Sequence, residues 1–161
     1  MIRGGNSGDS AAMGRIYCEA WKKAYDGIVP GEFLERLTPE MAAPPPERIS
    51  PDNCFVYDTG DGAIGLVSFG PCRDEAANGA AEIYSIYVLP VNWKSGIGSQ
   101  LFAAAKDKLA YAGYKKLILW TLTENSRARA FYEKMGMREY SKRTTEIAGK
   151  ALPETGYEMD I

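Results

Sequence analysis

The sequence predicts one domain of the α+β type, a mixed α/β arrangement in which helices flank a mostly antiparallel sheet. The length of 161 residues is ordinary for one domain. Apolar residues recur with helical spacing in four segments and with extended spacing in six. Only residues 81–122 have the strand-helix-strand order that a parallel pair requires. We therefore expect residues 1–161 to form one domain with about six to seven strands, one parallel pair and about four helices.

The first third of the chain predicts two helices and a linker. Asp9 or Ser10 can cap a helix whose apolar positions run at helical spacing to Ala24. A second, short helix ends before Pro39, because the residue ahead of a proline avoids the helical region. The proline-rich residues 43–51 are the best linker candidate.

Three extended segments follow the linker. Residues 53–58 and 63–70 are joined by Asp61-Gly62, a strong signal for a hairpin turn. Residues 80–90 form a longer run that is rich in β-branched and aromatic side chains. These patterns predict two antiparallel strands and a third strand that ends at Pro90.

The last part of the chain alternates helices and strands. An apolar stripe at helical spacing predicts a helix over residues 96–112, and the continuous apolar run 115–122 is typical of a central strand covered on both faces. Asn125 or Ser126 can cap another helix, which Gly136 ends. Two final strands are predicted, over residues 137–147 and 156–161.

The composition excludes several kinds of protein. The formal net charge of −2 gives no broad attraction to nucleic acid or to an anionic membrane, and no apolar stretch approaches the length of a membrane span. Histidine is absent, which excludes Ser-His-Asp and Cys-His catalysis. Cys18, Cys54 and Cys72 lack the spacing of a zinc site or a disulfide framework, so we expect no metal. The first residues lack the apolar core of a secretory signal, so we expect a cytoplasmic location.

The stretch "PVNWKSGIGSQLF", residues 90–102, places two glycines at a predicted strand-to-helix turn. It lacks the third glycine of the dinucleotide fingerprint and the Lys-Ser or Lys-Thr of the P-loop. Two interpretations remain. The turn can hold a phosphate on backbone N–H groups at a helix N-terminus, with Lys94 adding positive charge, or it can simply lead the chain into a helix.

A second motif favours the phosphate. "TENSRARAFYEKMGM" follows the predicted central strand, and together with "IYVLPVNWKSGIGSQLF" it resembles the GNAT superfamily of N-acetyltransferases. Members have Gln/Arg-x-x-Gly-x-Gly/Ala at a strand-turn-helix and a later Asn-x-x-Ala-x-x-Phe-Tyr-x-x-x-Gly. The match covers roughly residues 80–137 and extends more weakly into the first two helices. Trp93 departs from the pattern, since it stands where the family has glutamine or arginine.

The resemblance implies a GNAT-like fold and acetyl-CoA as co-substrate. It places the pyrophosphate on the N–H groups of residues 94–99, and Val88 N–H opposite the thioester oxygen. Asn125 would bond the pantetheine arm, cap its helix, or do both. The residues that the resemblance assigns to the cofactor are Ile86, Tyr87, Val88, Trp93, Lys94, Ser95, Gly96, Ile97, Gly98, Ser99, Asn125, Ala128, Phe131 and Tyr132.

The resemblance also implies direct attack of a primary amine on acetyl-CoA in a ternary complex. Tyr132 is the candidate acid that protonates the leaving thiolate. The alternative is that Tyr132 is only an aromatic residue of the core. Glu82 is the candidate general base, and the alternative is that it is only a polar residue at a strand edge. If Glu82 is not the base, Tyr84 is the alternative and acts through a water. The resemblance places Trp21, Tyr25 and Ile28 in the lining of the acceptor pocket. The alternative is that they make only ordinary packing contacts.

The implied partner is an amine of a small molecule or peptide, and a homodimer is compatible with the sequence. The competing interpretation, to which Trp93 lends weight, is a regulatory domain that binds acyl-CoA without catalysis. Nucleic-acid binding is disfavoured by the acidic balance, although residues 134–143 are locally basic.

Overall fold

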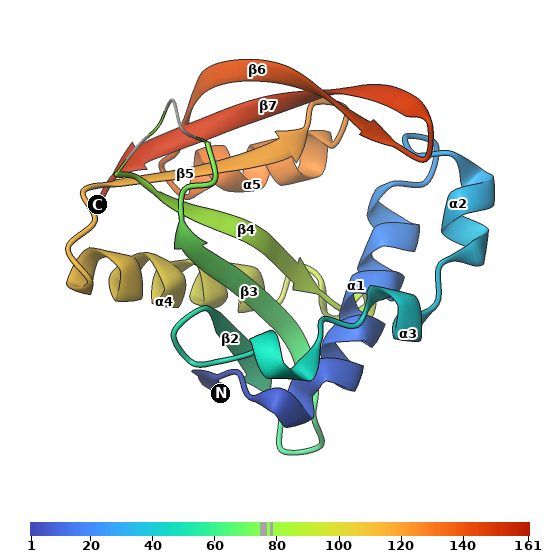
Figure 1. The fold of residues 1–161 in the computed structure, drawn as a ribbon, viewed down its shortest axis with the longest axis horizontal. Coiled ribbons are helices and arrows are strands. Elements are labelled where there is room, and N and C mark those ends of the chain that lie inside the picture. The colour runs from blue at the N-terminus through green and yellow to red at the C-terminus, as the bar shows by residue number, and fades with distance from the viewer. Residues whose placement is uncertain (75–76, 78) are drawn as a thin grey trace.

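The computed structural model describes residues 1–74, 77 and 79–161 (Figure 1). Its α-helices are α1 (Ser10–Ala24), α2 (Gly31–Arg36), α3 (Pro39–Ala42), α4 (Ile97–Tyr111) and α5 (Ser126–Lys134). Its strands are β1 (Ile2–Gly4), β2 (Cys54–Asp58), β3 (Ala63–Pro71), β4 (Ala81–Val88), β5 (Lys116–Leu122), β6 (Arg138–Ile147) and β7 (Lys150–Asp160). Single 3₁₀ turns cover Ser7–Asp9 (η1), Pro46–Arg48 (η2) and Pro90–Asn92 (η4).

The described strands form one sheet in the order β1-β2-β3-β4-β5-β7-β6. The β4–β5 pair is parallel and all the other neighbours are antiparallel. The predicted fold class is therefore confirmed, including the single parallel pair in residues 81–122. The hairpin predicted at Asp61-Gly62 joins β2 to β3.

Two elements lie outside the sequence prediction. Strand β1 has only three residues and forms because Arg3 and its neighbours pair with β2, a long-range contact that no local period reveals. Helix α3 is a single turn begun by Pro39 and capped by the Thr38 side chain, which accepts from Met41 N–H at 3.3 Å. It raises the number of α-helices from about four to five.

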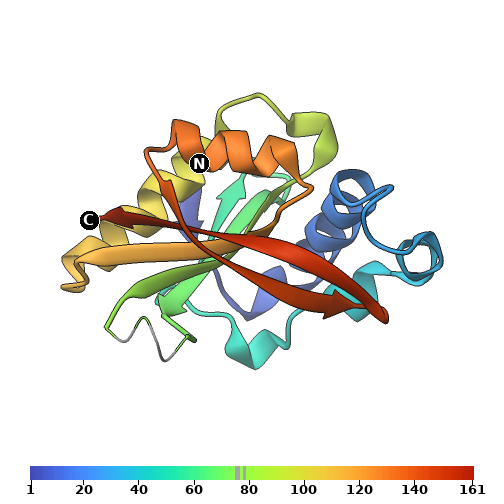
Figure 2. The same ribbon diagram turned by 90° about the horizontal axis from the view of Figure 1, so that it is seen from above.

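Both faces of the sheet are covered by helices. Leu66 and Val67 are neighbours on β3, point to opposite faces, and are each 0% exposed. Val67 belongs to the cluster beneath α4 and α5, whereas Leu66 belongs to the cluster beneath α1. Figure 2 shows α4 and α5 together on one side of the sheet. On β5 too, consecutive residues are buried on opposite faces, since Leu117, Ile118 and Leu119 are at most 1% exposed, which fits its continuous apolar run.

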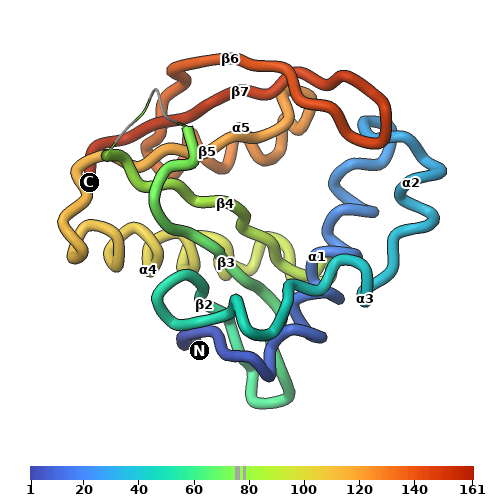
Figure 3. The backbone as a smooth tube through the Cα atoms, in the orientation of Figure 1, coloured from blue at the N-terminus to red at the C-terminus, as the bar shows by residue number. Residues whose placement is uncertain are grey.

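The sheet opens between β4 and β5. These strands pair only at Ala81–Leu117 and Glu82–Ile118, near the start of β4, and then diverge, as the tube in Figure 3 shows. The β3–β4 register shifts at Tyr84, which is the extra residue of a β-bulge. The divergence leaves one edge of β4 without a strand partner in the middle of the sheet.

Candidate functional site

A cleft of about 610 Å³ fills the opening between β4 and β5. Its lining comes from both strands, the turn into α4, the start of α5 and the end of α1. The predicted site residues that line it are Tyr25, Tyr84, Ile86, Tyr87, Val88, Trp93, Lys94, Ser95, Gly96, Ile97, Gly98, Ser99, Asn125, Ala128, Phe131 and Tyr132. Three others, Glu82, Trp21 and Ile28, lie outside the lining.

The N-terminus of α4 opens into this cleft without a side-chain cap. Gly96 is its N-cap residue and has a φ of +83°, a left-handed conformation that favours glycine, and Lys94 has a φ of +65°. The first N–H groups of a helix have no intrahelical acceptor. The turn therefore presents backbone donors and the positive end of a helix dipole to the cleft, an arrangement suited to an anion.

The free edge of β4 presents backbone groups to the same cleft. Leu89 N–H donates to Ile64 C=O on β3 at 2.9 Å, and hydrogen-bonded and non-hydrogen-bonded residues alternate along an antiparallel pair. The N–H and C=O of Val88 therefore point away from β3, toward the side where β5 has diverged. Consistent with this, Val88 C=O accepts from Trp93 Nε1 at 2.8 Å. Ile86, two residues earlier, points the same way.

Tyr132 lies in the cleft with its hydroxyl group unpartnered among the described residues. Its ring packs against Phe131 and Tyr157, with centroid distances of 5.4 and 6.0 Å, and the residue is 8% exposed. Burial, and secondarily Tyr87, raises the pKa of Tyr132 above its ordinary value. The phenol is therefore protonated throughout the neutral range.

Asn125 is the N-cap of α5. Its Oδ1 accepts from Ala128 N–H at 3.2 Å, so one of the two uses predicted for this residue is confirmed. The side-chain NH₂ group makes no bond within the described structure. Because Asn125 also lines the cleft, its amide donors are free for a ligand.

We predict that Asn125→Ala lowers the free energy of unfolding by about 1 kcal/mol, because an N–H at the start of α5 loses its acceptor. Asn125→Asp keeps an oxygen acceptor and should stay within about 0.5 kcal/mol of the wild type. Urea unfolding measures both values. Glu124→Ala is the matched control, since Glu124 is exposed and its side chain makes no described hydrogen bond or ion pair. Equal stability of the Asn125→Ala variant and the wild type would contradict the capping role.

Glu82 is held by Arg73 rather than open to the cleft. It is 2% exposed, and its carboxylate accepts from Arg73 backbone N–H at 3.0 Å, from Nε at 3.3 Å and from Nη2 at 2.7 Å. Arg73 also lies over the Tyr84 ring, 4.4 Å from its centroid. Of the two interpretations left open by the sequence, these contacts support a structural carboxylate.

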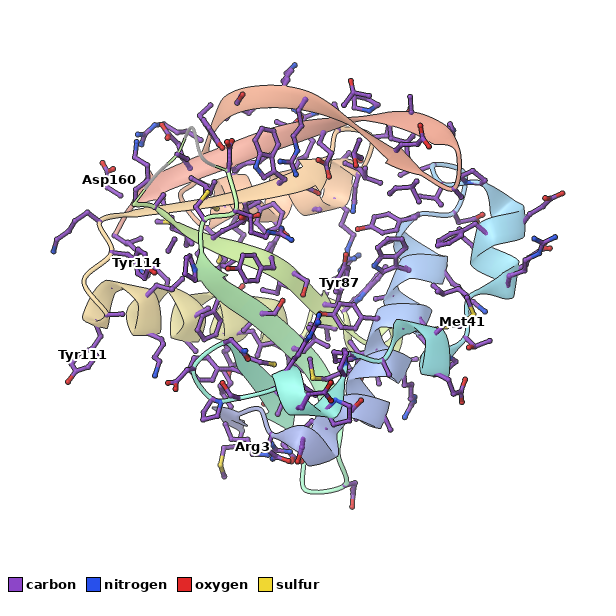
Figure 4. All side chains as sticks on the ribbon, viewed as in Figure 1. Arg3, Met41, Tyr87, Tyr111, Tyr114 and Asp160 are labelled. Atoms are coloured by element: carbon purple, nitrogen blue, oxygen red, sulfur yellow. The ribbon has the colours of Figure 1, made fainter. Side chains whose placement is uncertain are left out.

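Tyr25 and Tyr87 meet at the α1 side of the cleft. Their hydroxyl groups are 2.9 Å apart, and Figure 4 shows Tyr87 between the sheet and α1. Burial raises the pKa of Tyr25 to about 12. Trp21 packs behind Tyr25, with ring centroids 4.8 Å apart, and Ile28 offers its carbonyl oxygen to Lys150 Nζ. Tyr25 therefore faces the cleft, while Trp21 and Ile28 support the wall around it.

The structure adds residues that the sequence reasoning missed. Trp120 on β5 and Arg127 on α5 both line the cleft. Trp120 stacks beneath Arg143, and its buried Nε1 has no partner among the residues that the structure describes. A tryptophan within the aliphatic run 115–122 was a usable signal for Trp120. Arg127 stood inside the quoted motif but at one of its variable positions.

The described residues contain no group of three or more Asp, Glu, Cys or His side chains that could hold a metal ion. Within the same ranges, none of the helices combines the length and apolar character that crossing a membrane requires.

A splayed parallel pair, a helix N-terminus without a side-chain cap and a second helix beside it form the class of site suited to an extended ligand that carries a phosphate. The chain belongs to the acetyltransferase (GNAT) family, whose model matches residues 13–137. It is 27% identical over 149 residues to the uncharacterized N-acetyltransferase YuaI of Bacillus subtilis. The aligned region covers 92% of this chain and 86% of that protein.

Solved structures have the same fold. A GCN5-related N-acetyltransferase from Rhodopseudomonas palustris superimposes with a TM-score of 0.78 at 17% identity, covering 100% of this chain and 95% of that chain. PaiA N-acetyltransferase from Thermoplasma acidophilum, solved in complex with coenzyme A, gives a TM-score of 0.72 at 18% identity and covers 100% and 98%. These structures confirm the expected GNAT fold, and the family model confirms the acetyltransferase class.

Proposed function

We propose that this protein transfers the acetyl group of acetyl-CoA to a primary amine of a small molecule or peptide, by direct attack in a ternary complex. The observation that carries the proposal is the uncapped N-terminus of α4, which opens into the same cleft as the free edge of β4. A phosphate fits the helix N-terminus, and an extended amide-containing arm fits the strand edge. Coenzyme A carries both groups.

The comparisons support this cofactor. The Thermoplasma acidophilum relative is described in complex with coenzyme A, and a yncA acetyltransferase from Salmonella typhimurium is described with acetyl-CoA. The residues present fit the cofactor, because Ile86 and Val88 offer backbone groups beyond the point where β5 leaves. In our proposal the pyrophosphate lies on the N–H groups of residues 94–99.

The reaction forms a bond between the amine nitrogen and the acetyl carbon and breaks the bond from that carbon to sulfur. Val88 N–H is directed to stabilise the charge that develops on the carbonyl oxygen. Tyr132 donates its proton to the departing thiolate. Burial raises the pKa of Tyr132 above the ordinary phenol value near 10, so Tyr132 is a weaker acid than a thiol near 8.5. Donation is therefore partial and follows the growth of charge on sulfur.

The amine must lose a proton before it attacks, since an ordinary alkylammonium group has a pKa near 10. Glu82 was one candidate for this step, but its oxygens are occupied by Arg73. Tyr84 lines the cleft, and its hydroxyl group donates to Pro71 C=O, which leaves its lone pairs able to hold a water. We therefore assign proton removal to relay through a water held at Tyr84, which passes the proton to bulk solvent.

The alternative function is a regulatory domain that binds acyl-CoA without catalysis. A thiol-release assay with acetyl-CoA separates the two over four acceptor classes: polyamines, amino acids, antibiotic amines and peptide N-termini. We expect release that depends on one class and yields the acetylated amine by mass spectrometry. Binding of acetyl-CoA with no release on any amine would favour the regulatory domain.

A further inference from the structure

Trp93 and Arg127 form a stacked pair at the mouth of the cleft. The guanidinium carbon of Arg127 lies 3.4 Å from the centroid of the Trp93 ring. Tryptophan is the strongest aromatic partner for such a cation. The ring itself is anchored, because its Nε1 donates to Val88 C=O at 2.8 Å. The pair thus connects the turn before α4 to the first turn of α5.

Arg127 has no carboxylate partner within the part of the chain that the structure describes. Arg129, two residues later, shows the contrast: it pairs with Glu139 and donates to the Tyr157 hydroxyl group. The Trp93 ring covers one face of the guanidinium, which loses its hydration there, while the residue as a whole stays exposed. This partial burial lowers the pKa of Arg127 from its ordinary value. A bound anion would compensate for that loss.

The Trp93–Arg127 pair lies in the same cleft as the turn that leads into α4. Trp93 and Arg127 both line the cleft, as do Lys94 and Gly96 of the uncapped turn. The indole N–H of Trp93 is committed to Val88 and cannot also donate to a phosphate at this turn. Arg127 therefore adds a second positive charge beside that of Lys94, and Trp93 orients it.

We propose that Trp93 and Arg127 act as one phosphate-binding unit, in which the indole holds the guanidinium in position to bind a phosphate of coenzyme A. This inference rests on the proposed function, namely that the cleft binds acetyl-CoA. Guanidinium groups form paired, charge-assisted hydrogen bonds to phosphate oxygens. The phosphate is either the pyrophosphate or the phosphate on the ribose, and these two sources are separated by the ligands below.

The test is equilibrium binding of coenzyme A by calorimetry, with no acceptor present. Arg127→Gln should raise Kd about ten- to a hundredfold, the effect of one charge-assisted hydrogen bond. Trp93→Leu should weaken binding in the same direction, and the double variant should be no weaker than Arg127→Gln alone, because the two residues act as a unit. Arg36→Gln is the charge-matched control, since exposed Arg36 on α2 lies away from the cleft.

Two truncated ligands identify the phosphate. An effect of Arg127→Gln that persists with 3′-dephospho-CoA assigns the contact to the pyrophosphate, and an effect that disappears assigns it to the ribose phosphate. With phosphate-free pantetheine the variant and the wild type should bind alike. A Kd for coenzyme A within twofold of the wild type in Arg127→Gln, or an equal loss with pantetheine, would overturn the inference.

The outcome also separates this inference from the proposed function. A wild-type protein that binds no coenzyme A would remove both. Wild-type binding that Arg127→Gln leaves intact would remove only the role of the pair.

Discussion

Tyr132→Phe should lower kcat about 10²- to 10⁴-fold while the Kd for acetyl-CoA stays within about threefold, the range expected for loss of a general acid. The thiolate then leaves without a proton donor. The substitution is structurally mild, because the Tyr132 hydroxyl group has no described partner and the ring contacts with Phe131 and Tyr157 are retained. Single-turnover thiol release measures the chemical step directly.

Tyr111→Phe is the matched control for that experiment. Tyr111 lies on α4 and is 94% exposed, so the same loss of a hydroxyl group should leave kcat unchanged. Since burial raises the pKa of Tyr132 above its ordinary value, the acid stays protonated as pH rises to about 10. The wild-type kcat should therefore show no fall due to Tyr132 below that pH. Unchanged turnover in the Tyr132→Phe variant would remove the residue from the mechanism.

The α4 end of the site could be predicted from sequence because its signals are local. The Gly96-x-Gly98 spacing marks a strand-to-helix turn, and the structure places an uncapped helix N-terminus there. Asn125 likewise stood one residue before a helical period and caps α5. Each of these features is encoded within a few consecutive residues, which is the range over which sequence patterns are informative.

The features that escaped prediction depend on contacts between distant segments. Strand β1 exists because β2 is available to pair with it. The stack of Arg127 on Trp93 joins residues 34 positions apart, as the numbering shows. The family pattern marks Trp93 only as a departure, whereas the structure shows that its ring stacks on a cation from α5. Periodicity carries no information of that kind.

The role of Glu82 also could not be decided from the sequence, because it depends on a contact with another segment. Its position relative to Gly96 made it a candidate base, and the sequence left open whether it was catalytic or a polar strand residue. The deciding information is Arg73, nine residues earlier, on the segment that follows β3. No spacing rule connects the two residues, because the segment between β3 and β4 has no fixed period. Only the fold shows that this carboxylate is already paired.

Arg73→Met should lower the free energy of unfolding by about 2–3 kcal/mol, at or below the roughly 3–5 kcal/mol for breaking a fully buried ion pair, because the Arg73 side chain is 63% exposed. The variant leaves Glu82 buried with one backbone donor. Arg73→Met combined with Glu82→Gln should recover most of that loss, since no unpaired charge is then buried. Arg138→Met is the control: this exposed arginine shares Glu158 with Lys116, and its loss should cost under about 1 kcal/mol.

The same variants decide how Glu82 relates to catalysis. If Glu82 is structural, Glu82→Gln leaves the rising limb of the pH profile of kcat/KM where it is in the wild type, because the group that deprotonates the amine is unchanged. A limb that moves in Glu82→Gln, together with stability equal to the wild type, would instead identify Glu82 as the base. Tyr84→Phe then provides the complementary measurement. It removes the hydroxyl group that we propose holds the water, and it should lower kcat/KM while the Arg73–Glu82 pair, and hence the stability, is preserved.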